Sequence, residues 1–208
     1  MLDAAGFPRA KIVASNDLDE TVIASLFEQG ARIDTFGVGT RLVTAYDQPA
    51  LGGIYKLGAA RDEHGAWREA IKLSEQPIKI SNPGNLAVRR LRRGGELVAD
   101  IIYDSEAGFS KATLHDIDDP LRPPLSPVFD ESSDLLVTYL RGGTQVCAAD
   151  TVEVARARAA RELAQLSPRA RRFLNPQPYP VGLDPHVHTR KQELVAEARE
   201  RTAIAARS

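Results

Sequence analysis

The chain has 208 residues, of which 43% are hydrophobic and 26% charged, a composition typical of a globular protein. Its formal net charge of -1 gives no reason to expect nucleic acid as a partner, and its one cysteine excludes an internal disulfide framework. The sequence has neither a run of about 18 apolar residues that would cross a membrane nor the basic and apolar regions of a secretion signal. These features predict a cytoplasmic protein with no membrane partner.

The chain opens on a few helix-compatible residues, Leu2 to Ala5. Gly6 is a suitable helix stop, and Pro8 prevents the helix from continuing. A beginning at the end of a helix favours a chain cut from a longer one.

A short strand and a helix follow. Lys11 to Ser15 is a continuous apolar run, as expected for a parallel strand that is covered on both faces. Asn16 and Asp17 are candidate helix caps, and Glu20 stands three residues after Asp17, as in a capping box. We therefore expect a helix from Leu18 to about Gln29, with its apolar side chains on one face.

A second strand, roughly Ile33 to Val38, completes a βαβ unit. Such units are nearly always right-handed, with parallel strands. The loop of Ser15-Asn16-Asp17 and the loop of Gly37-Val38-Gly39-Thr40 should therefore emerge at the same edge of the sheet. Both loops are then able to face one ligand.

The rest of the chain predicts a mostly β region that ends in helices. The segment from Asp116 to Pro127, rich in proline and aspartate, predicts an extended loop, and Pro176, Pro178 and Pro180 predict an extended crossing before the last helix. The expected strands are Leu51–Gly58, Ala66–Leu73, Glu96–Asp104 and Leu135–Leu140, and the expected helices are Val152–Leu166 and about Thr189–Ala206.

The glycine loop is the candidate site. Gly37 and Gly39 flank one valine, so the loop can turn sharply and present N–H groups next to the Thr40 hydroxyl, which suits a phosphate. The alternative is a plain turn, because the loop lacks the third glycine of a dinucleotide fingerprint and the lysine of a P-loop. Two interpretations are also open for Ser15-Asn16-Asp17, which is a helix cap in either case and is a ligand contact in one of them.

Other motifs have simpler interpretations. Arg89 to Arg93 reads as a solvated face, with an oligomer or anion contact as the alternative. His186 and His188 resemble a pair of metal ligands, but no cluster of Cys, Asp or Glu completes the set, so no metal ligands are predicted. Cys147 is expected to be a small hydrophobe. The arginine-rich helix after Thr151 favours a packed or subunit-facing helix over a nucleic-acid element.

Several motifs in order carry a resemblance. The motifs are Ser15-Asn16-Asp17-Leu18-Asp19-Glu20, Phe36-Gly37-Val38-Gly39-Thr40-Arg41-Leu42-Val43-Thr44, Leu51-Gly52-Gly53-Ile54-Tyr55-Lys56-Leu57, Lys72-Leu73-Ser74, Asn82-Pro83-Gly84 and Asn175-Pro176-Gln177-Pro178-Tyr179-Pro180-Val181-Gly182. With these motifs in this order, the chain resembles the C-terminal part of nicotinate phosphoribosyltransferase over essentially its whole length.

The resemblance implies a fold and a reaction. That family joins nicotinate to the ribosyl group of 5-phosphoribosyl 1-diphosphate, coupled to ATP hydrolysis, and forms nicotinate mononucleotide for NAD synthesis. The implied fold is α/β: a partial, irregular type II phosphoribosyltransferase barrel in residues 1–50, then a C-terminal β-rich region with terminal helices in residues 51–208. Gly37, Val38, Gly39 and Thr40, with Ser15 and Asn16, match the loops that would hold the donor's 5-phosphate.

The resemblance also implies what this chain lacks. A full family member is more than twice as long, works with magnesium and ATP, and is expected to form a homodimer. None of the four histidines, His64, His115, His186 and His188, matches the histidine that ATP phosphorylates, so no catalytic residue is assigned. Two hypotheses follow: a working part of an enzyme that another segment completes, or a non-catalytic remnant or interaction module that retains weak phosphate binding.

Overall fold

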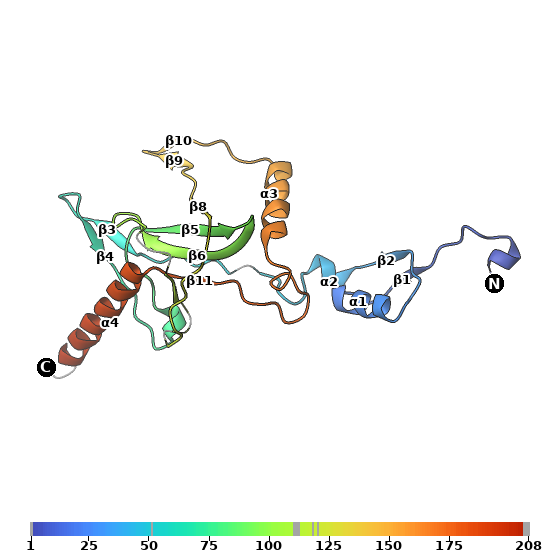
Figure 1. Ribbon diagram of the computed structural model, residues 1–208, viewed down its shortest axis with the longest axis horizontal. Coiled ribbons are helices and arrows are strands. Elements are labelled where there is room, and N and C mark those ends of the chain that lie inside the picture. Colours follow the sequence, from blue (N-terminus) through green and yellow to red (C-terminus); the bar gives the residue numbers. More distant parts are fainter. Residues whose placement is uncertain (1, 51, 110–112, 118, 120, 206–208) are drawn as a thin grey trace. The chain divides into compact units, whose positions relative to one another are not determined.

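The computed structural model describes residues 2–50, 52–109, 113–117, 119 and 121–205 (Figure 1). The chain divides into two compact units, Met1–Tyr55 and Lys56–Ser208. Each unit has its own sheet or sheets, and the content is mixed α/β with open sheets. Within the described residues, no helix is both long and apolar enough to cross a membrane.

The first unit is the expected βαβ arrangement. Strands β1 and β2 pair in parallel, with Ser15 opposite Gly37, which confirms the predicted topology. The initial turn η1 ends at Gly6 in the left-handed conformation, also as predicted. The elements are η1 (Asp3–Ala5), β1 (Val13–Ser15), α1 (Glu20–Glu28), β2 (Thr35–Gly37) and α2 (Thr40–Val43), the last of which the sequence did not indicate.

The start of α1 differs from the prediction. Asp19, not Asn16 or Asp17, is the N-cap, and its Oδ1 accepts a hydrogen bond from the Val22 N–H at 2.8 Å. Asn16 and Asp17 instead adopt positive φ values of 93° and 48°. The chain therefore turns through two left-handed residues before the helix begins, and the expected capping box between Asp17 and Glu20 is wrong.

A five-stranded sheet organises the second unit, in the order β7-β11-β6-β5-β8. The long hairpin of β5 and β6 is green in Figure 1, and α4 packs against β6 and β11. Leu91, Ala99, Ile101 and Leu114 form the core cluster of this sheet. The strands are β5 (Leu86–Arg93), β6 (Glu96–Asp104), β7 (His115–Asp116), β8 (Glu131–Asp134) and β11 (Val181–Leu183).

Smaller elements complete the second unit. Two hairpins lie outside the main sheet, and one 3-10 turn precedes β5. Helix α3 confirms the predicted helix, with Thr151 as its cap, whereas α4 begins before the expected Thr189. The elements are β3 (Ala59–Arg61), β4 (Trp67–Glu69), η2 (Pro77–Lys79), β9 (Leu140–Arg141), β10 (Thr144–Gln145), α3 (Val152–Gln165) and α4 (Pro185–Ala205).

Two predicted strands are wrong. Residues 52–58 form no strand, because the Gly58 carbonyl accepts N–H groups from Ala70 and Gly84 in a loop contact instead of a ladder; Leu51 lies outside the described residues. In the predicted strand Leu135–Leu140, only Leu140 is in a strand, because the ladder with β5 has already ended at Asp134. Asp118 and Pro120 of the predicted loop also lie outside the described residues.

The arginine run is not a solvated face. Residues 89–93 belong to β5, which pairs with β6 on one side and β8 on the other, and Leu91 is 0% exposed. Arg90 makes a bidentate ion pair with Asp100 (2.9 and 2.7 Å) and a second pair with Glu162 (2.9 Å). Arginines that the sequence suggests are solvated are therefore partly buried in the sheet, where carboxylates pair with them.

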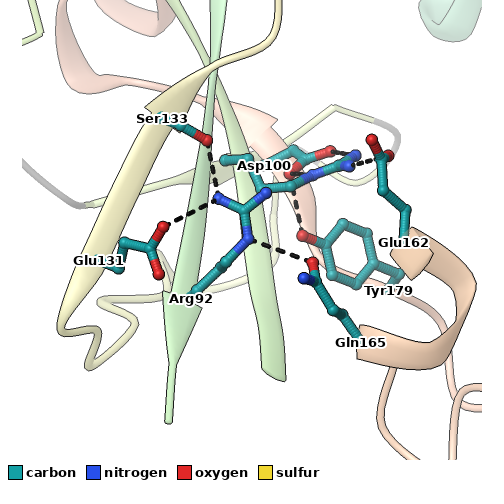
Figure 2. Close-up of polar contacts among 8 residues, drawn as sticks. Arg92, Asp100, Glu131, Ser133, Glu162, Gln165 and Tyr179 are labelled. Atoms are coloured by element: carbon teal, nitrogen blue, oxygen red, sulfur yellow. Dashed lines mark hydrogen bonds and ion pairs between the residues drawn. The ribbon is translucent and has the colours of Figure 1, made fainter. Parts of the chain in front are cut away.

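Polar contacts tie α3 to the sheet. Figure 2 shows Glu162 and Gln165 reaching from α3 toward the strands, with Tyr179 donating its hydroxyl to Asp100 at 2.9 Å. Arg92 donates to Gln165 (3.3 Å) and to Ser133 (2.7 Å). Burial and the neighbouring Asp100 raise the pKa of Tyr179, so this hydroxyl stays protonated and serves as a donor. We assign the network a structural role.

Candidate phosphate site

A cavity of about 380 Å³ in the first unit brings the predicted site residues together. It lies where β1 and β2 end, at the edge that the parallel pairing predicts. All six predicted residues line it. Asp17, which was expected as a helix cap and ligand contact of the same loop, lines it as well, as do Leu18 and Arg41, which were assigned no ligand contact. The lining is Ser15, Asn16, Asp17, Leu18, Gly37, Val38, Gly39, Thr40 and Arg41.

The two glycines of the loop have different surroundings. A Cβ added to Gly37 would come within 3.2 Å of Ser15 Oγ, since the two residues face each other in the β1–β2 register. A Cβ added to Gly39 would meet nothing within 4 Å. Gly37 therefore permits the close approach of the strand ends, and Gly39 leaves the backbone of the loop accessible.

The opposite wall of the cavity has an uncommon backbone. Asn16 (φ 93°) and Asp17 (φ 48°) are consecutive left-handed residues without being glycine. Such conformations are costly, and they cluster at ligand-binding loops where the surrounding structure maintains them. The buried Leu18, 7% exposed, follows directly and anchors this turn to the unit.

Thr40 supplies a hydroxyl to the site. Its side chain is exposed, and its Oγ1 has no hydrogen-bond partner among the described residues. The Thr40 carbonyl, by contrast, is occupied, because it accepts the Thr44 hydroxyl at 2.7 Å. The free group is thus the one that can donate to an anion.

Arg41 is the charged residue that sequence reasoning did not assign. Its guanidinium pairs with Asp19 Oδ2 at 2.9 Å and lies 4.6 Å from the centre of the Tyr46 ring. Both contacts hold the side chain beside the glycine loop, at the rim of the cavity. The sequence could have indicated Arg41 by its position directly after Thr40, because a cation next to a phosphate-binding loop attracts the anion.

The donor set determines what the cavity can do. Hydroxyls, backbone N–H groups and one guanidinium suit an oxyanion, and Asp17 adds one carboxylate, able to accept hydrogen bonds from sugar hydroxyls. No histidine lines the cavity, and the part of the chain that is described contains no group of three or more His, Cys, Asp or Glu side chains able to hold a metal ion. The site is equipped for binding and orientation.

The other candidates lie elsewhere. His188 stacks on His115, and His186 is exposed on α4. Cys147 is partly buried, and its thiol contacts the Ala148 carbonyl at 3.4 Å. All of these residues belong to the second unit.

Comparison with known proteins connects the chain to a family. The model of the nicotinate phosphoribosyltransferase C-terminal domain matches residues 86–191. The chain belongs to the nicotinate phosphoribosyltransferase family. This confirms the resemblance seen in the sequence. The cavity lies upstream of the matched residues, so the family match and the phosphate site are separate observations.

Relatives extend the similarity. The nicotinate phosphoribosyltransferase of Bacillus subtilis (strain 168) is 48% identical over 117 residues, which cover 53% of this chain and 23% of that protein. Nicotinate phosphoribosyltransferase 2 of Arabidopsis thaliana is 33% identical over 190 residues, 88% of this chain and 33% of that protein. The chain therefore spans about a third or less of these relatives.

A solved structure shows the same fold. The crystal structure of human nicotinic acid phosphoribosyltransferase superposes with a TM-score of 0.58 at 24% identity. The match covers 93% of this chain and 36% of the human one.

Proposed function

We propose that this chain supplies the 5-phosphate cradle and the C-terminal region of a nicotinate phosphoribosyltransferase. The reaction joins nicotinate to the ribosyl group of 5-phosphoribosyl 1-diphosphate, coupled to ATP hydrolysis, and yields nicotinate mononucleotide for NAD synthesis. The observation that carries the proposal is the cavity in which Ser15 and Asn16 meet Gly37 to Thr40. The names of the relatives give nicotinate and the phosphoribosyl group, and the resemblance seen in the sequence implies the diphosphate donor and ATP.

The cradle contributes binding and orientation. The loop N–H groups and the Thr40 hydroxyl hold the 5-phosphate, and Arg41 adds positive charge at the rim. The 5-phosphate is remote from the sugar carbon at which diphosphate leaves and nicotinate attaches. Its binding energy therefore positions the donor for attack and does not itself stabilise the charge that develops on the ring.

The proposed reaction requires magnesium and ATP, but the described residues do not form a binding site for either. The cavity offers one carboxylate, Asp17, and no lysine, and the described part of the chain has no cluster of metal-ligating side chains. These residues do not fit a magnesium or ATP site by themselves. We accordingly propose that segments other than the described residues bind magnesium and ATP. Closure of the barrel and formation of a homodimer would likewise need those segments.

The test is a binding titration of the full 208-residue chain with ribose 5-phosphate and with 5-phosphoribosyl 1-diphosphate. Thr40→Val removes the free hydroxyl and keeps the shape, so binding should weaken roughly tenfold, as for a lost hydrogen bond to a charged group. Thr35→Val is the matched control, since Thr35 lies in β2 but does not line the cavity. Equal weakening by both variants, or none by Thr40→Val, would contradict the cradle.

A second candidate is a non-catalytic module that retains weak phosphate binding. The observation favouring it is the chemistry of the cavity lining, whose hydroxyls, backbone N–H groups and guanidinium serve binding. An assay of the isolated chain with nicotinate, the ribosyl donor, ATP and magnesium tests both candidates at once. Donor binding without turnover fits this module and a part that needs completion; turnover at ordinary enzymatic rates excludes both.

A further inference from the structure

A stacked pair of histidines holds the edge strand of the five-stranded sheet. His115 lies in β7 and His188 in α4, and their rings are 3.9 Å apart at an angle of 8°. Strand β7 contains two residues, which pair with Gly182 and Leu183 of β11. So short a ladder gives few hydrogen bonds. The ring stack adds to the other contacts that hold this segment, namely the core packing of Leu114 and its bridge to Leu125.

The fit of β7 against β11 is close. A Cβ added to Gly182 would lie 2.6 Å from the His115 carbonyl oxygen and 2.6 Å from Leu114 Cδ1. The backbone of β7 thus has little room to shift while the sheet stays intact.

Lys191 is the charged group that acts on His188, and His186 and Asp104 act with His115 on the nearby Asp184. Lys191 and His186 belong to α4, and Asp104 ends β6. Asp116 of β7 pairs with Arg122 at 2.7 Å, and Lys191 donates to Asn82 at 2.9 Å.

Asp184 is buried just before α4 and is 0% exposed. Its Oδ1 accepts the Val187 N–H at 2.8 Å, whereas Oδ2 has no hydrogen-bond partner within the described residues. Burial raises the pKa of Asp184. His186 and His115 act in the opposite direction and lower the pKa of Asp184, so this carboxyl also interacts with the stack.

We propose that the His115–His188 stack is an acid-sensitive clasp, which holds β7 in the sheet while the rings are neutral and releases it when both are protonated. Two imidazolium rings at this separation repel each other, and the ammonium of Lys191 adds to the repulsion. Protonation of one ring disturbs the stack less than protonation of both. The release of β7 should therefore depend more steeply on pH than the titration of a single histidine does.

The sign of the effect follows from His188. Burial, and then His115 and Lys191, lower the pKa of His188 below its usual 6.5. A group with a lowered pKa in the folded state stabilises it above the unfolded pKa, and this contribution is lost as the pH falls below about 6.5. Asp184 acts in the opposite direction, because its protonation in acid relieves a buried charge. The clasp must therefore be measured locally.

Release would change one surface in particular. Leu114, directly before β7, is bridged to Leu125, and both line a cavity of about 560 Å³ together with Asp116. Loss of β7 from the sheet frees this wall of the cavity. The structure thus links an acidic medium to the opening of one defined pocket of the second unit.

Amide hydrogen exchange on the full chain tests the clasp at about pH 7.5 and about pH 5.5, with rates corrected for intrinsic pH dependence. Protection of residues 113–117 should fall several-fold in acid, while β5 and β6 change little. His188→Phe keeps an aromatic ring that cannot titrate, so its protection should not respond to pH. His64→Gln, at an exposed turn between β3 and β4, is the matched control and should respond like the wild type.

An NMR titration of the imidazoles gives a second readout, which does not depend on how His188→Phe folds. His115→Phe should raise the pKa of His188, because one of the charges that lowers it is removed. Unchanged protection of residues 113–117 in the wild type overturns the proposal. So does an acid response that persists in His188→Phe, or a pKa of His188 that is unaffected by His115→Phe.

Discussion

The two units differ in how they are stabilised. Among the described residues, the first unit has one buried hydrophobic side chain, Leu18, whereas the second has ten, most of them on β5, β6 and their neighbours. The first unit exposes Ile12, Val13, Phe27 and Leu42 instead. The candidate phosphate loop therefore belongs to the first unit, which has almost no hydrophobic core. The second unit has the larger hydrophobic core but no assigned ligand.

Binding geometry and stability are separable in this chain. The parallel pair of β1 and β2 is sufficient to bring the cavity residues together. It does not bury enough apolar surface to be stable alone, because two strands and one helix leave most side chains in water. Trp67, the only tryptophan, lies in the second unit, so its fluorescence follows that unit while circular dichroism follows both.

Breaking the buried ion-pair network should have the largest effect on stability. Asp100→Ala leaves Arg90 and Tyr179 without their shared acceptor in the second unit, and should cost about 3–5 kcal/mol of unfolding free energy. Urea unfolding followed by Trp67 fluorescence measures it. Asp19→Asn is the counterpart in the first unit: it keeps the cap of α1, weakens the pair with Arg41, and should cost about 1 kcal/mol or less.

A core truncation sharpens the same contrast. Leu91→Ala removes a side chain that is 0% exposed, and should cost about 2–5 kcal/mol through lost burial and a cavity. Leu42→Ala, in a side chain that is 69% exposed, should change the unfolding free energy by about 0.5 kcal/mol or less. A large effect of Leu42→Ala would show that the first unit has more core than the structure indicates.

Matched glycine substitutions give a smaller difference. Gly182→Ala places a Cβ against the backbone of His115 and should destabilise the second unit by about 1–3 kcal/mol. Gly39→Ala meets nothing within 4 Å and should leave thermal unfolding nearly unchanged. If the two variants unfold alike, then β7 is not packed against Gly182 as described.

The smallest expected effect concerns Asp184. Asp184→Asn keeps an acceptor for the Val187 N–H and removes a buried negative charge, so stability at neutral pH should change by about 1 kcal/mol or less. Because burial raises the pKa of Asp184, the wild type gains stability relative to the variant as the pH falls through that raised value. Thermal unfolding of both proteins from neutral to mildly acidic pH measures the difference. A constant difference would mean that the carboxyl is not desolvated.

The sequence predicted the candidate site better than the larger unit. The six site residues come from one local βαβ unit, where strand register alone determines which side chains meet. Asp17 was expected in the ligand-facing loop, but its left-handed conformation was not, and Arg41 was missed because its position depends on the contact with Asp19. Those features involve backbone conformation and side-chain packing, which periodicity does not report.

In the second unit, β6 and α3 were predicted and β5 was not. The arginines of β5 suggested a solvated surface, because their partners are distant in sequence: Asp134 for Arg89, and Asp100 and Glu162 for Arg90. Burying a charge is favourable only when such partners are in place. A pattern confined to residues 86–93 cannot show them.

The parallel pairing of β6 with β11 has a consequence for synthesis. Tyr179 and Asp100 are 79 residues apart, and β11 joins the open side of β6 only after all the intervening chain exists. At about 5–20 residues per second, β6 waits several seconds after translation before its neighbour arrives. During that interval the exposed flank of β6 is an aggregation hazard on the ribosome, and a chaperone that shields nascent strands would act at this stage.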